Sequence, residues 1–79
     1  MSEQPINVGI DVAKDTVDVA VSNGEAFQTT NDETGISELG QRLQALAPER
    51  IVMEATGGYE QPLVAALGLA GLPVIVVNP

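Results

Sequence analysis

The sequence predicts a small α/β domain: three antiparallel strands followed by a helix, a strand, a second helix and a last strand. Over residues 6–30, apolar and polar residues alternate in short runs separated by turn residues, which is typical of half-buried antiparallel strands. From residue 31 onward, helical spacing of apolar residues alternates with short apolar runs, which is typical of parallel strands joined by helices. The 79 residues, 44% of them hydrophobic, suffice for one folded domain.

The first three strands are expected to form a meander. Residues 6–12 alternate strictly, and the alternation returns over residues 17–21 after a gap short enough for a hairpin turn. Asn23 and Gly24 form a second turn signal, after which residues 25–30 can form a third antiparallel strand.

The rest of the chain is expected to alternate helices with parallel strands. Capping residues at 31–35 precede an amphipathic stripe of Ile36, Leu39, Leu43 and Leu46. Residues 51–55 form a short, mostly buried strand, and the stripe of Leu63, Ala66, Leu67 and Ala70 predicts the second helix. The continuous apolar run at 73–77 is typical of a parallel strand covered on both faces.

Charge and composition restrict the chemistry. Eleven acidic residues stand against Lys14, Arg42 and Arg50, giving a net charge of -8, which argues against this chain alone binding nucleic acid through its phosphates. The chain has no cysteine and no histidine, which excludes disulfides, thiolate or imidazole metal ligands and histidine-activated nucleophiles. Carboxylates remain as the strong candidates for catalysis or for binding a hard metal ion.

The ends of the chain indicate a cytoplasmic protein. Residues 1–5 lack the basic and apolar regions of a signal peptide and are expected to be disordered. Residues 61–79 carry no charge, but Gly68, Gly71 and Pro73 interrupt them, so no membrane span is expected.

Two carboxylates stand out because each lies within an apolar strand. Asp11 follows Val8-Gly9-Ile10, and Glu54 follows Ile51-Val52-Met53. Burying an unpaired carboxylate costs free energy, so each is expected to have a partner, a metal ion or an opening to solvent. Both lie near the carboxyl ends of their strands, where open α/β sheets bind ligands. If the strands are parallel neighbours, roughly 4.8 Å apart, both side chains can reach one divalent cation. The alternative is that each acid accepts hydrogen bonds in a turn.

The segment after Glu54 is a second candidate site. Thr56, Gly57 and Gly58 come directly before a helix, where backbone amides and the helix N-terminus can bind a phosphate. The alternative is a tight turn that needs glycine for its dihedral angles. Lys14 is a further candidate for phosphate contact and Tyr59 for stacking on a base, against the plainer roles of a turn residue and a core residue.

Four separated blocks occur together in one order. They comprise residues 8–14, residues 31–35 with Leu39 and Leu43, residues 53–59, and residues 71–74 with 77–79. In this order and spacing the chain resembles the amino-terminal region of DEDD transposases of the insertion-sequence-110 family, over nearly its whole length after Pro5.

The resemblance implies the first part of a RuvC-like domain of the ribonuclease H superfamily over residues 6–79. Four acids bind Mg²⁺ in that family, and Asp11 and Glu54 correspond to the first two, as catalytic residues and metal ligands. The other two acids belong to a later helix, so this chain by itself is expected to bind magnesium weakly and to be inactive. The expected partners are DNA, whose phosphodiesters are the substrate, a structured guide RNA, and further copies of the protein.

Two other functions remain open. The actin-like ATPase and sugar kinase superfamily also begins with a Gly-Ile-Asp strand, although its phosphate-contacting turn usually continues with Gly-Thr, where this chain has Val12-Ala13-Lys14. The other alternative is a non-catalytic truncated or oligomerisation module, because an open sheet exposes apolar surface and unpaired edges.

Overall fold

The structure is a computed structural model that describes residues 4–54 and 57–78. Its elements follow the predicted order. They are β1 (Asn7–Val12), β2 (Thr16–Val21), β3 (Ala26–Thr30), α1 (Glu33–Leu46), β4 (Arg50–Glu54), α2 (Gln61–Leu69) and β5 (Val74–Val77).

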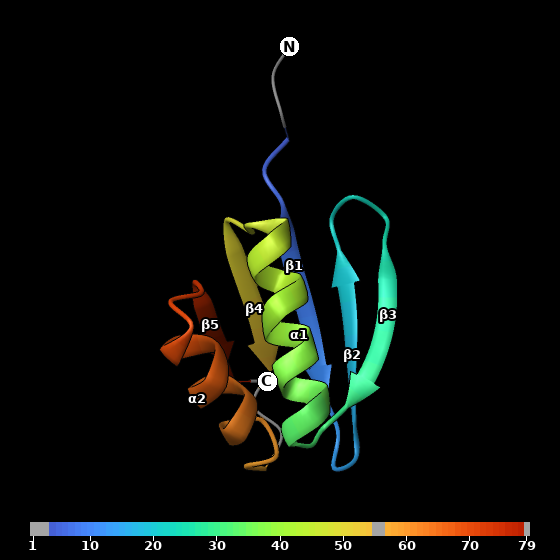
Figure 1. Ribbon diagram of the computed structural model, residues 1–79, viewed down its shortest axis with the longest axis vertical. Coiled ribbons are helices and arrows are strands. Elements are labelled where there is room, and N and C mark those ends of the chain that lie inside the picture. Colours follow the sequence, from blue (N-terminus) through green and yellow to red (C-terminus); the bar gives the residue numbers. More distant parts are fainter. Residues whose placement is uncertain (1–3, 55–56, 79) are drawn as a thin grey trace.

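The strands form one sheet in the order β3-β2-β1-β4-β5. β1 pairs antiparallel with β2, and β2 pairs antiparallel with β3, which confirms the predicted meander. β4 lies parallel to β1, and β5 lies parallel to β4, each reached through a helix. As a result, the carboxyl ends of β1 and β4 meet at the same edge of the sheet (Figure 1).

Both helices cover the same face of the sheet (Figure 1). Alternation along β1 directs Val8, Ile10 and Val12 toward the helices, and the intervening residues toward the other face. The apolar stripes predicted for the helices supply the rest of the core. Its buried members are Val8, Ile10, Val12, Val17, Val19, Val21, Ile36, Leu39, Leu43, Ile51, Met53, Leu63 and Leu67.

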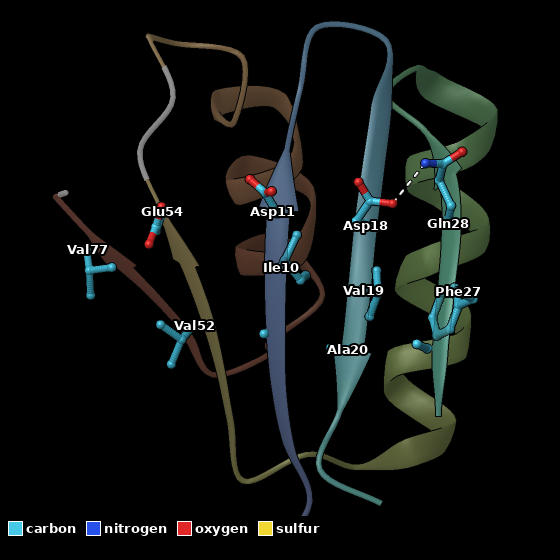
Figure 2. A pocket seen from close by; sticks show the side chains of 12 residues that line it. Ile10, Asp11, Asp18, Val19, Ala20, Phe27, Gln28, Val52, Glu54 and Val77 are labelled. Atoms are coloured by element: carbon cyan, nitrogen blue, oxygen red, sulfur yellow. Dashed lines mark hydrogen bonds between the residues drawn. The ribbon is translucent and has the colours of Figure 1, made fainter. Parts of the chain in front are cut away.

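The sheet face opposite the helices is not covered by any element of the described residues (Figure 2). The prediction that the last strand is covered on both faces is therefore wrong. Ile75, Val76 and Val77 are 46%, 43% and 37% exposed. The apolar run was correctly identified as a parallel strand, but β5 is the edge of a sheet whose second face is open, so continuous hydrophobicity does not here indicate burial.

Residues 1–3, part of the segment expected to be disordered, lie outside the described residues, whereas Gln4 and Pro5 are exposed and have no regular structure. None of the helices in the described part of the chain has the length and apolar character required to cross a membrane.

Candidate functional site

The two carboxylates singled out in the sequence lie on neighbouring strands. Ile10 of β1 is paired with Met53 of β4, and Asp11 and Glu54 each follow by one residue. Because Ile10 and Met53 point into the core, the next residue in each strand points to the open face. Figure 2 shows both carboxylates on that face, at the carboxyl ends of β1 and β4.

Asp11 and Glu54 are both exposed to solvent. The sequence left open whether a partner, a metal ion or water relieves the cost of placing a carboxylate within an apolar strand. The open face supplies water, so neither carboxylate needs a neutralising neighbour for the sheet to fold. Both are consequently accessible to a ligand that approaches this face.

A third carboxylate lies in the same row. Asp18 of β2 is directly opposite Asp11 in the antiparallel register, and its Oδ1 accepts a hydrogen bond of 2.8 Å from Nε2 of Gln28 on β3. The alternation over residues 17–21 marks Asp18 only as a polar residue on one face of the second strand. Its position could have been read from the hairpin, since a tight turn after Val12 places the residues of β2 opposite those of β1.

The residues beside this acidic row are small or apolar. Gly9 of β1 lies between Ala20 of β2 and Val52 of β4 in the sheet register. Without large side chains there, the twisted sheet forms an open concavity of about 800 Å³. Its lining includes Gly9, Ala20, Ala26, Val52 and Val77 as well as Asp11, Asp18, Gln28 and Glu54.

The glycine-rich loop between β4 and α2 lies at the same edge (Figure 1). Gly57 and Gly58 have φ angles of 67° and 100°, which favour glycine, so the turn requirement foreseen for them is confirmed. The amide of Gly58 donates a hydrogen bond of 3.1 Å to Oε1 of Glu60, which is only 8% exposed. Glu60 thus orders the loop before α2. Thr56, a predicted phosphate contact, lies outside the described residues.

Lys14 and Tyr59 lie on either side of this edge. Lys14 is exposed in the turn between β1 and β2, and Tyr59 is 49% exposed in the loop before α2, so Tyr59 is not the core residue that one alternative suggested. Their backbone carbonyls both accept hydrogen bonds from the side chain of Asn31, at 3.4 Å for Lys14 and 3.1 Å for Tyr59. The sequence treated Asn31 only as part of a helix-capping segment.

The donor set at this edge fits a hard divalent cation. Asp11 and Glu54 offer carboxylate oxygens on adjacent strands, open to solvent, and magnesium prefers such ligands with water completing its coordination. Within the described residues, no three acidic side chains come close enough together to enclose a metal ion. Two carboxylates would leave most coordination positions to water.

The family comparison bears directly on this site. The sequence model of DEDD transposases of the insertion-sequence-110 family, described as a transposase, matches residues 8–79. The chain belongs to this transposase family. No protein among those with curated functions is similar enough in sequence to count as a match.

Two solved structures share the fold of this transposase chain. RuvC of Thermus thermophilus has a TM-score of 0.57 at 18% identity, covering 94% of this chain and 62% of RuvC. A non-polymerising mutant of MamK bound to AMPPNP has a TM-score of 0.58 at 11% identity, covering 98% of this chain and 42% of MamK. The chain thus spans less than two thirds of either protein. At these identities the likeness shows the fold alone, and it confirms the predicted ribonuclease H-like architecture.

Proposed function

We propose that this transposase chain forms the first part of a magnesium-dependent catalytic domain that cleaves and joins DNA phosphodiesters. Asp11 and Glu54 are the proposed catalytic residues and supply two of the metal ligands. The observation that carries the proposal is their placement side by side at the carboxyl ends of β1 and β4, on the open sheet face. Ligands of open α/β sheets bind at this edge.

The proposed roles of the chain's own residues follow from their chemistry. The two carboxylates hold the cation, and the accessible sheet face admits the DNA phosphate beside it. When bound, magnesium supplies stabilisation of the negative charge that accumulates on the phosphate oxygens during in-line displacement. Gly57 and Gly58 at this edge are proposed to contact the substrate backbone, together with Lys14, Thr56 and Tyr59.

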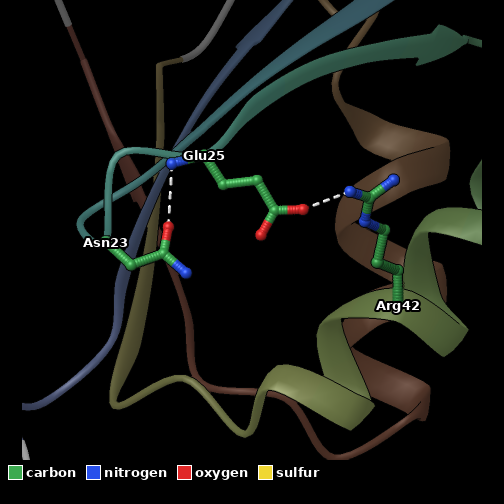
Figure 3. A network of polar contacts seen from close by, with 3 residues as sticks. All are labelled: Asn23, Glu25 and Arg42. Carbon is green, nitrogen blue, oxygen red and sulfur yellow. Dashed lines mark hydrogen bonds and ion pairs between the residues drawn. The ribbon is translucent and has the colours of Figure 1, made fainter.

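The distribution of positive charge supports a proposal about where nucleic acid is held. Of its three basic residues, only Lys14 belongs to the turn beside Asp11. Arg42 forms an ion pair with Glu25 (Figure 3) and lies 3.7 Å from the ring centroid of Phe27. Arg50 begins β4 at the opposite end of the sheet. We therefore propose that DNA and a structured guide RNA are bound mainly by other parts of a longer, oligomeric transposase, and that this chain alone is inactive.

The metal assignment is tested by titrating the chain with Mn²⁺, a paramagnetic substitute for Mg²⁺, and recording amide signals by NMR. We expect selective broadening around Asp11 and Glu54. Asp11→Asn and Glu54→Gln should each raise the Mn²⁺ concentration for half-maximal broadening by at least about tenfold, since each removes a ligand. Glu38→Gln, which removes one exposed carboxylate from α1, is the charge-matched control.

A transposition assay with the complete transposase extends the test to function. Asp11→Asn and Glu54→Gln should abolish strand cleavage at any magnesium concentration, whereas Glu38→Gln should retain it. If the two variants bind Mn²⁺ like the unaltered chain and transpose normally, the site assignment fails, and the non-catalytic alternative is favoured.

A further inference from the structure

Asn31 joins three segments at the edge that carries Asp11 and Glu54. It lies between the last residue of β3 and the residue that caps α1. Its Nδ2 donates to the carbonyl of Ala13 at 2.9 Å and to that of Tyr59 at 3.1 Å, with a longer contact of 3.4 Å to Lys14. Its backbone amide donates to the carbonyl of Asp15 at 3.0 Å.

The carbonyl acceptors determine the orientation of this side-chain amide. With the amide turned by 180°, Oδ1 would face the carbonyl oxygens of Ala13 and Tyr59, and two acceptors cannot form a hydrogen bond. The NH₂ group must therefore point toward the two segments. Asn31 acts as a donor, and a side chain without that donor cannot replace it.

The other end of the amide has no comparable role. Oδ1 of Asn31 is buried and has no hydrogen-bond partner among the described residues. A buried acceptor without a partner lowers stability, so the stabilising contacts of this side chain are those of its donors. The observed arrangement satisfies the donors that link the segments and leaves the acceptor unpaired.

The two linked segments flank the candidate catalytic carboxylates. Ala13 and Lys14 form the turn that begins two residues after Asp11, and Tyr59 belongs to the loop that follows Glu54. Among the described residues, no backbone-to-backbone hydrogen bond joins this turn directly to this loop. The pairing of β1 with β4 holds the carboxylates, whereas the Asn31 side chain holds the turn and the loop beyond them.

We propose that Asn31 is a positioning residue that fixes the Lys14 turn relative to the Gly57–Tyr59 loop, and so shapes the rim that receives the DNA phosphate beside Asp11 and Glu54. The statement that this rim receives a DNA phosphate rests on the proposed function above. The link between turn and loop does not, because it is a property of the hydrogen bonds alone.

Asn31→Asp is the most direct variant, because it keeps the size of the side chain and removes both donors. Asn31→Ala removes the link without placing a carboxylate next to carbonyl oxygens, and serves if Asn31→Asp folds poorly. The matched control is Asn23→Asp at the opposite end of the sheet. There the asparagine acts as an acceptor, with Oδ1 2.8 Å from the amide of Glu25 (Figure 3), and aspartate preserves that function.

Hydrogen exchange followed by NMR tests the link itself. Asn31→Asp and Asn31→Ala should raise the exchange rates of Asn31, Gly58 and Gln61 amides at least about tenfold. Amides in the centre of β1 and β4 should change less than about twofold, as should all amides in Asn23→Asp. Unchanged exchange of the Asn31, Gly58 and Gln61 amides, or an equal increase throughout the sheet, would overturn the positioning role.

The catalytic consequence is read from kinetics of the complete transposase. The Asn31 variants should raise the KM for DNA about tenfold while the Mn²⁺ concentration for half-maximal activity stays within about twofold, because strand pairing still holds both metal ligands. A lower kcat with unchanged KM would contradict a role in shaping the phosphate-binding rim. If Asp11→Asn leaves metal binding intact, the proposed function fails, and the exchange rates still decide whether Asn31 links the two segments.

Discussion

At the residue scale, Gly35 shows how closely α1 approaches the sheet. A Cβ atom at this position would lie 2.1 Å from the carbonyl oxygen of Thr30 and 2.3 Å from its Oγ1. Backbone atoms cannot move aside as a flexible side chain can, so only glycine allows the first turn of the helix to lie here. Gly35 thereby keeps the β3–α1 junction, which contains Asn31, close to the sheet.

Gly35→Ala is expected to destabilise the chain by about 1–3 kcal/mol, the usual cost of overpacking a tight site. Gly40→Ala provides a matched control in the same helix, because its Cβ would meet only Cδ2 of Leu67 at 3.9 Å. There the better helix propensity of alanine should stabilise by up to about 1 kcal/mol. Urea unfolding of both variants measures the difference, and equal stabilities would refute the close-approach explanation.

At the element scale, Asp32 determines where α1 begins. Its Oδ1 accepts hydrogen bonds of 2.8 Å from the amide of Gly35 and from Oγ1 of Thr30. These bonds favour the ionised carboxylate, and the bond from Gly35, followed by that from Thr30, lowers the pKa of Asp32 below its ordinary value of 3.8. The helix cap is therefore coupled to the protonation of one exposed side chain.

The sign of this coupling gives a testable pH dependence. Because folding lowers the pKa of Asp32, its contribution to stability is complete above 3.8 and is lost as the pH falls through the lower folded value. Asparagine can still accept the capping bonds but does not titrate, so Asp32→Asn should lose less stability than the unaltered chain over that range. Thermal unfolding across the pH range measures this, with Asp15→Asn as the charge-matched control. If Asp15→Asn reduced the loss of stability at low pH as much as Asp32→Asn does, the helix cap would not be the cause of the pH dependence.

At the scale of the whole molecule, the edge strand β5 is the most unusual surface. β5 is an edge strand that exposes Ile75, Val76 and Val77, and the sequence from Gln61 onward carries no charge. Natural edge strands usually carry charged residues that prevent pairing with another chain. Despite the net charge of -8, a second copy of this chain can approach β5 without bringing like charges together.

We therefore predict that the chain self-associates through β5 at high concentration. Sedimentation equilibrium should show dimers or larger species, and Ile75→Lys should shift the chain to monomer because it places a charge in the edge strand. Gln41→Lys adds the same positive charge at an exposed position of α1 and should leave association unchanged. A monomer at all concentrations, or equal effects of the two lysine variants, would contradict pairing through β5.

Much of the site was predictable because patterns of neighbouring residues determine which strand, and which face of it, holds each carboxylate. Alternation along the strand placed Asp11 on the face away from the buried Ile10. The short apolar run placed Glu54 at the end of a strand. The proximity of the two carboxylates depended on β1 and β4 being parallel neighbours, a condition that the sequence left open and the register confirms. Asp18 and Asn31 were not recognised as parts of the site. The local pattern around a polar strand residue, or around a residue near a helix cap, is the same whatever lies next to it in the fold.

The sequence by itself determined the order of elements, the face of each strand that enters the core and the two acids that stand out, because these follow from periodicity along the chain. Only the tertiary structure decided that β5 is exposed and that Asn31 joins the turn after β1 to the loop before α2. Each of these depends on contacts between residues distant in sequence. Periodicity reports which face of an element is apolar, and it contains no information about which segment lies against that face or at its edge.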